Sequence, residues 1–345
     1  MSGATTAGTT AVPEPAPPGG LPRRSDRRWK LALLLLLTGL LAALVVLTGW
    51  YLLTRKPITQ ILPPLDGVSL PQFSYAVYGT SSPMGIAVTA SGDRIYVTEM
   101  DGQRMVRIFD GKRRQIGSFA PPGSIPSDRL PMYVAVEPST GDVYVSDRDA
   151  RAIFVYSRDG VYRRTFQPGP TLPEWQPLGL AFDRDGDLWV GDVSDPVQRI
   201  HEFRPDGTLV RTVGDAGEFS FPNGLAVTTS GSLLVADGNH GRLAQFDAEG
   251  LPLAGVRRGM SDGELGLPRG VALDDQGRIY VTDTTASVVD VYRLDEAQRP
   301  VFVGLVGAYG LSDGQLRYPG GIAADTRGRI YVADWSNDRV EVWSY

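Results

Sequence analysis

The chain has 345 residues, of which 42% are hydrophobic and 21% are charged, which is typical of a globular protein with a sizeable core. It contains no cysteine, and this excludes disulfides, thiolate metal sites and cysteine nucleophiles. Its two histidines, His201 and His240, are too few for any mechanism that needs three imidazoles.

The N-terminal region predicts a tail and one membrane-spanning helix. Residues 1–30 form a basic tail, and residues 1–22 have almost no large apolar side chains, so we expect disorder there. Residues 31–53, LALLLLLTGLLAALVVLTGWYLL, are uncharged and long enough as a helix to cross a hydrocarbon core of about 30 Å. A cleaved signal peptide is the alternative, but the following GWYLLTRKP offers no small-x-small cleavage site.

Charges on the two sides of this helix predict its orientation. Five basic residues precede it and two follow it: Arg23, Arg24, Arg27, Arg28 and Lys30, against Arg55 and Lys56. The positive-inside rule then places the N-terminus in the cytoplasm and everything after residue 54 outside. Residues 57–345 hold 27 Lys or Arg and 37 Asp or Glu, a net charge of −10 that argues against a nucleic-acid partner. Residues 54–72 contain four prolines and predict a short, semi-stiff stalk.

Residues 73–345 contain six copies of one sequence repeat. Each copy begins at a proline, turns at a glycine and ends in Asp or Glu: PMGIAVTASGDRIYVTE (83–99), PMYVAVEPSTGDVYVSD (131–147), PLGLAFDRDGDLWVGD (177–192), PNGLAVTTSGSLLVAD (222–237), PRGVALDDQGRIYVTD (268–283) and PGGIAADTRGRIYVAD (319–334). The alternating segments predict strands, the glycine turns predict hairpins, and further apolar segments supply a third and usually a fourth strand. Because one small sheet cannot bury both faces, six such sheets predict an all-β, six-bladed propeller.

The ring needs a closing strand. The sixth copy supplies its third strand at residues 340–343, VEVW, and FSYAVYG (73–79) resembles the outer strand of the fifth copy. We therefore predict that this N-terminal strand completes the last blade.

The repeat resembles a known family. The phrase P-x-G-[IVL]-A-V, a glycine turn, [IL]-Y-V-x-D and N-x-R-[VI]-x-V is similar to the NHL repeat, and YPGGIAADTRGRIYVADWSNDRVEVW is the nearest copy. The lead-in segments GMSDGELGLPRG and GLSDGQLRYPGG also resemble those between NHL repeats. The resemblance implies the propeller fold over residues 73–345 and no particular function.

One face of the predicted propeller is the expected binding surface. The loops from strand 4 to strand 1 and from strand 2 to strand 3 share this face and carry most of the variable residues. We expect binding residues there, with three exposed aromatic anchors and four residues near the central mouth: Trp175, Trp335, Tyr133, and Asn223, Arg269, Asp237, His240.

The same face raises the question of a metal. Six carboxylates end the second strands, and we expect them to cap turns rather than bind a cation: Glu99, Asp147, Asp192, Asp237, Asp283 and Asp334. FPNGLAV resembles a metal-binding blade of the gluconolactonase and SMP-30 lactonases, which implies Asn223 as a ligand beside an acidic residue in each of two other blades. Met84 and Arg269 occupy those places, and neither can replace a carboxylate ligand.

A second enzymatic resemblance also lacks its ligands. The amidating lyase with an NHL-like core implies zinc held by several histidines, which this chain does not have. We expect His201 to be packed within a strand.

Two hypotheses of function follow. The first is a membrane-anchored, extracytoplasmic binding module for a protein, peptide or glycan, without a cofactor. The alternative is a hydrolase or lyase of the SMP-30 type that binds Ca²⁺ or Zn²⁺ near Asn223, Asp237 and His240 and acts on a small molecule.

Overall fold

The structure is a computed structural model that describes residues 25–54, 69–168, 172, 175–194 and 196–345. It separates into two units at Thr54. The first unit contains one helix, α1 (Ser25–Thr54), and its segment Trp29–Gly49 is long and apolar enough to cross a membrane by length and composition. The tail predicted to be disordered and most of the predicted stalk lie outside the described residues.

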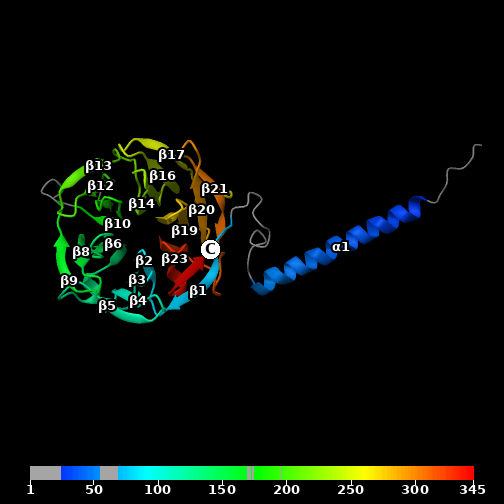
Figure 1. The fold of residues 1–345 in the computed structure, drawn as a ribbon, viewed down its shortest axis with the longest axis horizontal. Coiled ribbons are helices and arrows are strands. Elements are labelled where there is room, and N and C mark those ends of the chain that lie inside the picture. The colour runs from blue at the N-terminus through cyan, green and yellow to red at the C-terminus, as the bar shows by residue number, and fades with distance from the viewer. Residues whose placement is uncertain (1–24, 55–68, 169–171, 173–174, 195) are drawn as a thin grey trace, which may run out of the picture. The chain divides into compact units, whose positions relative to one another are not determined.

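The second unit is a ring of six antiparallel, four-stranded sheets around a central axis (Figure 1). Blades 1 to 6 consist of the following strands: blade 1, β2 (Pro83–Val88), β3 (Arg94–Glu99), β4 (Val106–Asp110) and β5 (Gln115–Phe119); blade 2, β6 (Pro131–Val136), β7 (Val143–Asp147), β8 (Ala152–Tyr156) and β9 (Tyr162–Phe166); blade 3, β10 (Pro177–Phe182), β11 (Leu188–Asp192), β12 (Arg199–Phe203) and β13 (Leu209–Val213); blade 4, β14 (Pro222–Val227), β15 (Leu233–Asp237), β16 (Arg242–Phe246) and β17 (Pro252–Val256); blade 5, β18 (Pro268–Leu273), β19 (Ile279–Asp283), β20 (Val288–Leu294) and β21 (Pro300–Val306); blade 6, β22 (Pro319–Ala324), β23 (Arg329–Asp334), β24 (Arg339–Ser344) and β1 (Gln72–Tyr78). Among the described residues, the short 3-10 helices η2 (Pro126–Asp128) and η3 (Trp335–Asn337) lie in loops.

The closing strand is where the sequence predicted it. β1 pairs antiparallel with β24, with Val77 opposite Val340 and Gln72 opposite Ser344. The predicted six-bladed propeller, completed by an N-terminal strand, is therefore confirmed.

Burial follows the order of strands within each blade. The second strands β7, β11, β15 and β19 are buried at every residue, whereas the outer strand β17 is exposed at all positions but Val256. Apolar clusters fill the spaces between neighbouring blades; one joins Val97 of blade 1 to Tyr331 of blade 6. Packing between blades thus supplies the core that a single blade lacks.

The glycine of each proline phrase permits the inner strands to approach one another. A Cβ at Gly224 would lie 2.8 Å from the Cα of Gly270, and one at Gly270 would lie 3.0 Å from the Cα of Gly321. No side chain fits at these distances. The repeated glycine is therefore a packing requirement of the axis, and its replacement by Tyr133 in blade 2 is an exception with its own consequence.

Candidate functional site

The inner strands of blades 1 to 3 carry a buried apolar cluster. Met84, Met132 and Leu178 are buried there beside Tyr133. The Tyr133 hydroxyl of blade 2 donates a hydrogen bond of 3.2 Å to the Arg269 carbonyl of blade 5, on the opposite side of the ring. Burial raises the pKa of Tyr133 to about 12, so the phenol stays neutral. The expectation of an exposed aromatic at this position is wrong, because the side chain fills the axis where other blades have glycine.

The two tryptophans differ in exposure. Trp175 is only 7% exposed and packs against Phe166 and Phe203, with ring centroids 6.3 and 5.9 Å away. The predicted exposure of Trp175 is also wrong, because its indole completes the core between blades 2 and 3. Trp335 lies in η3, half-buried, with its ring 6.5 Å from that of Tyr318 on the loop face.

Asn223, Asp237 and His240 already have partners within the protein. The Asn223 side chain is buried and its Nδ2 donates to the Phe221 carbonyl at 2.9 Å. One oxygen of Asp237 lies 2.8 Å from His240 Nδ1 and accepts a hydrogen bond of 2.8 Å from Arg242 Nε. A guanidinium thus already occupies one side of this carboxylate, where a metal ion would need open ligand sites.

The carboxylates at the strand ends are expected to cap the turn that follows them. Asp147, Asp192 and Asp283 do so, and all six carboxylates also cap the loop that precedes their blade. Each member accepts a hydrogen bond from a backbone N–H of the loop that precedes its blade: Glu99 from Ser81, Asp147 from Leu130, Asp192 from Gln176, Asp237 from Ser220, Asp283 from Leu267 and Asp334 from Arg317. These bonds explain why the repeat ends in an acidic residue.

Four of the six carboxylates have an arginine or histidine side chain within 4.0 Å. The four pairs are Glu99 beside Arg107 at 2.9 Å, Asp192 beside His201 at 3.4 Å, Asp237 beside Arg242 at 2.8 Å and Asp334 beside Arg339 at 3.1 Å. His201 is buried within β12, as expected from its place in a strand. Within the described part of the chain, Asp147 of blade 2 and Asp283 of blade 5 have no ion pair within 4.0 Å.

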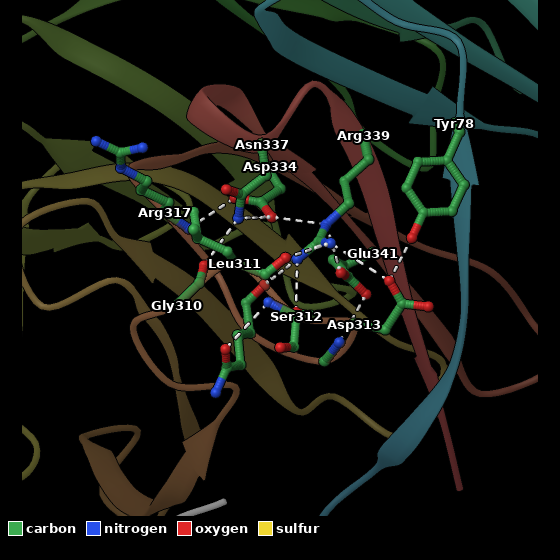
Figure 2. A network of polar contacts seen from close by, with 12 residues as sticks. Tyr78, Gly310, Leu311, Ser312, Asp313, Arg317, Asp334, Asn337, Arg339 and Glu341 are labelled. Carbon is green, nitrogen blue, oxygen red and sulfur yellow. Dashed lines mark hydrogen bonds and ion pairs between the residues drawn. The ribbon is translucent and has the colours of Figure 1, made fainter. Parts of the chain in front are cut away.

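Blade 6 has the most complete of these networks (Figure 2). Arg339 is buried, and its Nε lies 3.1 Å from Asp334 and 2.7 Å from Glu341. Its terminal nitrogens donate to the carbonyls of Leu311, Ser312 and Gln315 at 3.0, 2.7 and 2.8 Å. One guanidinium therefore joins two strands of blade 6 to the loop 310–318.

Burial opposes ionisation of the acidic partners in blade 6. It raises the pKa of Glu341 to about 8 and that of Asp334 to about 6, although the Arg339 charge acts in the opposite direction. Without Arg339, both carboxylates would be buried charges without compensation.

Exposed apolar side chains gather on the loop that leads into blade 6. Tyr309, Leu311 and Tyr318 are exposed there, and Trp335 packs beside Tyr318. Met260, on the loop that leads into blade 5, is 90% exposed. The sequence analysis did not predict this exposed apolar surface, although the apolar residues inside the lead-in segments could have indicated it.

A second acidic group lies at the opposite, 1→2 face of blade 3. Asp183, Asp187 and Glu202 each place a carboxylate oxygen within 4.8 Å of the others. Trp189 Nε1 donates to Asp183 at 3.0 Å, and Arg211 pairs with Glu202. Two of the three carboxylates in this cluster, Asp183 and Glu202, thus already have side-chain partners within the protein.

Comparison with known proteins agrees with the geometry of the repeat. A family model of the NHL repeat matches residues 219–246, 265–287 and 316–343, which lie in blades 4 to 6. The chain is 30% identical to human NHL-repeat-containing protein 4 over 125 residues, which cover 34% of this chain and 94% of that protein. The chain belongs to the NHL-repeat family.

Other relatives of this NHL-repeat protein differ in function. A Caenorhabditis elegans protein described as "Probable peptidyl-alpha-hydroxyglycine alpha-amidating lyase" is 27% identical over 46% of this chain and 45% of its own length. The chain spans about half the length of several curated relatives that it matches. A solved structure of a streptogramin B lyase has a TM-score of 0.57 at 14% identity over 78% of this chain and 96% of its own, which supports the propeller fold.

Proposed function

We propose that this NHL-repeat protein is a membrane-anchored binding module that presents its propeller outside the cytoplasm. The protein contacts its partner, a protein or peptide, through the face formed by the 4→1 and 2→3 loops. The observation that carries this proposal is the exposed apolar group Tyr309, Leu311 and Tyr318, with Trp335 beside it. Tyrosine and tryptophan side chains are common anchors of protein interfaces.

The buried cluster on the inner strands, with Tyr133 bonded across the ring, supports binding at the rim. Catalytic sites in concave folds need a cavity that surrounds a small substrate, whereas Met84, Met132 and Tyr133 occupy the axis of this propeller. The hydrolase alternative receives no specific support from Asn223, Asp237 and His240, because Asn223 and Asp237 are hydrogen-bonded within the protein.

Charge flanking α1 supports the anchored arrangement. Five basic residues precede the apolar segment and two follow it, and the positive-inside rule then assigns the propeller to the outer side. External protease added to intact cells tests this orientation. Degradation of the propeller without lysis supports it, and protection until lysis would contradict it.

Pull-down from solubilised membranes tests the binding face. We expect the full chain to enrich a partner that is depleted at least tenfold with Leu311→Ala or Trp335→Ala. Leu251→Ala is the matched control, because Leu251 is an exposed leucine in a 3→4 turn on the other face. Equal enrichment by all variants would show that this surface is not the binding site.

A further inference from the structure

Blades 5 and 6 are preceded by loops with the same scaffold. The loops read GMSDGELGL (259–267) and GLSDGQLRY (310–318). The Ser261 N–H donates to the Glu264 carboxylate at 3.1 Å, and the Ser312 N–H donates to the Gln315 side chain at 3.1 Å. Each loop also has a parallel bridge and a glycine at positive φ: Arg258 to Leu265 with Gly263 (φ +77°), and Tyr309 to Leu316 with Gly314 (φ +78°).

The two blades differ in the strand that faces these loops. Arg339 stands opposite Asp334 in blade 6, and Val288 stands opposite Asp283 in blade 5. Two residues further along the third strand, both blades have a buried carboxylate, Glu341 in one and Asp290 in the other. Blade 5 therefore keeps the acceptors of the blade 6 network and lacks its guanidinium.

A cavity of about 260 Å³ lies at this place in blade 5, and we call it the blade 5 pocket. Its lining includes four carboxylates and three larger apolar side chains: Asp262, Glu264, Asp283, Asp290, Met260, Val288 and Leu305.

Asp290 is the buried acceptor of this pocket. It is 3% exposed, and no described residue donates a hydrogen bond to its carboxylate or pairs with it within 4.0 Å. Burial, with the charges of Asp283 and Asp262, raises its pKa to about 8. The Tyr292 hydroxyl, on the same side of β20, is also buried without a partner among the described residues. Such a carboxylate is costly to bury unless something pairs with it.

We propose that the blade 5 pocket binds a guanidinium group from outside the chain. Asp290 and Asp283 accept its N–H groups, together with the carbonyls of Met260, Ser261 and Glu264, whose counterparts hold Arg339 in blade 6. A guanidinium presents five donors in one plane, which suits several acceptors around one centre.

The apolar lining favours an arginine side chain over a bare metal ion. The side chains of Val288, Leu305 and Met260 carry no oxygen ligand, but they can pack against methylene groups. The net charge of −10 over residues 57–345 also attracts a cationic ligand. An arginine of the protein partner is the source that the proposed function supplies, and on this point the inference rests on that function; free arginine shares the same chemistry.

Titration calorimetry of the full chain in detergent with methylguanidinium tests the pocket without any partner. We expect saturable binding by the wild type, at least tenfold weaker binding with Asp290→Asn, and none with Val288→Arg, which supplies the guanidinium from within the chain. Glu249→Gln, which removes an exposed carboxylate elsewhere, leaves the affinity unchanged. Circular dichroism verifies that each variant is folded.

Three results would overturn the proposal: no saturable binding of methylguanidinium, equal affinities of the wild type and both pocket variants, or saturable Ca²⁺ binding without a guanidinium response. Acetyl-Gly-Arg-Gly-amide, its citrulline analogue and free arginine identify the source. Tighter binding of the arginine peptide supports a partner side chain, and binding of free arginine alone supports a small-molecule ligand in the same pocket. Leu311→Ala retains guanidinium binding even if the pull-down fails, so the two proposals fail separately.

Discussion

Blades 5 and 6 each bury two carboxylates near their lead-in loop, but they differ in the group that faces these carboxylates. In blade 6, Asp334 and Glu341 share the buried guanidinium of Arg339. In blade 5, Asp283 and Asp290 face Val288 and a cavity. The repeat retains its strand-end carboxylate because that group caps loop N–H groups in every blade. Compensation of its charge is a separate requirement, and an internal arginine or an external group can supply it.

The largest expected effect comes from breaking the blade 6 network. Arg339→Met leaves two buried carboxylates and three loop carbonyls without their donor, so we expect a loss of about 3–5 kcal/mol in the free energy of unfolding. Urea unfolding followed by tryptophan fluorescence measures it. Arg327→Met, which removes an exposed arginine from the same blade, is the control and should have little effect. A change as small as that of the control would show that Arg339 is not the central residue of the network.

The converse change tests whether blade 5 can be made to resemble blade 6. Val288→Arg introduces a guanidinium beside Asp283 and Asp290, and we expect the free energy of unfolding to rise by about 1–3 kcal/mol, as for hydrogen bonds to charged groups. Val288→Met adds comparable apolar length without charge and serves as the control. Equal effects of the two substitutions would mean that filling the cavity, rather than pairing the carboxylates, accounts for the gain.

The pH dependence of the free energy of unfolding tests whether Asp290, the unpaired carboxylate of blade 5, has a raised pKa in the folded state. Folded Asp290 holds its proton up to about pH 8, whereas the unfolded residue releases it near its ordinary pKa of 3.8. The folded state therefore binds more protons within this window, and stability falls as the pH rises through it. Asp283, Asp262, Glu264 and Tyr292 surround the group, and none supplies a positive charge.

The substitution Asp290→Asn should remove this loss of stability at high pH. We expect the variant to be about 1–3 kcal/mol more stable than the wild type at pH 8, with convergence of the two below pH 4. Denaturant unfolding at a series of pH values gives the difference profile. Parallel profiles across the whole range would show that Asp290 does not titrate in this environment.

The smallest expected effect comes from removing Asn337, an uncharged hydrogen-bond donor in blade 6. Asn337 donates to Asp334 at 2.7 Å and to the Gly310 carbonyl at 3.0 Å, and its counterpart in blade 5 is Ala286. Asn337→Ala should cost about 1 kcal/mol, well below the effect of Arg339→Met. Thermal unfolding measures the ranking of the two variants, and the opposite order would place the amide rather than the guanidinium at the centre of the network.

The fold could be predicted because its determinants repeat. Alternating segments, glycine turns and the proline phrase occur six times, so an uncertain strand in one blade is supported by its copies in the others. The closing strand could also be predicted, since blade 6 lacked a fourth segment and residues 73–79 resembled one. Capping of the following turn by Asp147, Asp192 and Asp283 agrees with local backbone geometry, whereas the bonds of all six carboxylates to the preceding loops join segments that are distant in the sequence.

The site depended on contacts between distant segments, which no local pattern encodes. Tyr133 reaches across the axis to Arg269, and Trp175 enters the core between two blades, so both aromatic residues are buried although they occupy variable positions. The sequence indicated the blade 5 pocket at Val288, because blades 3, 4 and 6 have arginine at the corresponding position. Val288 could be interpreted as part of a pocket only once the positions of Asp290 and the loop 259–267 in the fold were known.

A crystal structure of the Val288→Arg variant tests the central claim most directly. The relation between the two blades predicts that the introduced guanidinium lies within hydrogen-bond distance of the Asp290 carboxylate and the Ser261 carbonyl, as Arg339 does with Glu341 and Ser312. A guanidinium directed into solvent, with the pocket still open behind it, would contradict the claim that blade 5 is built to receive this group.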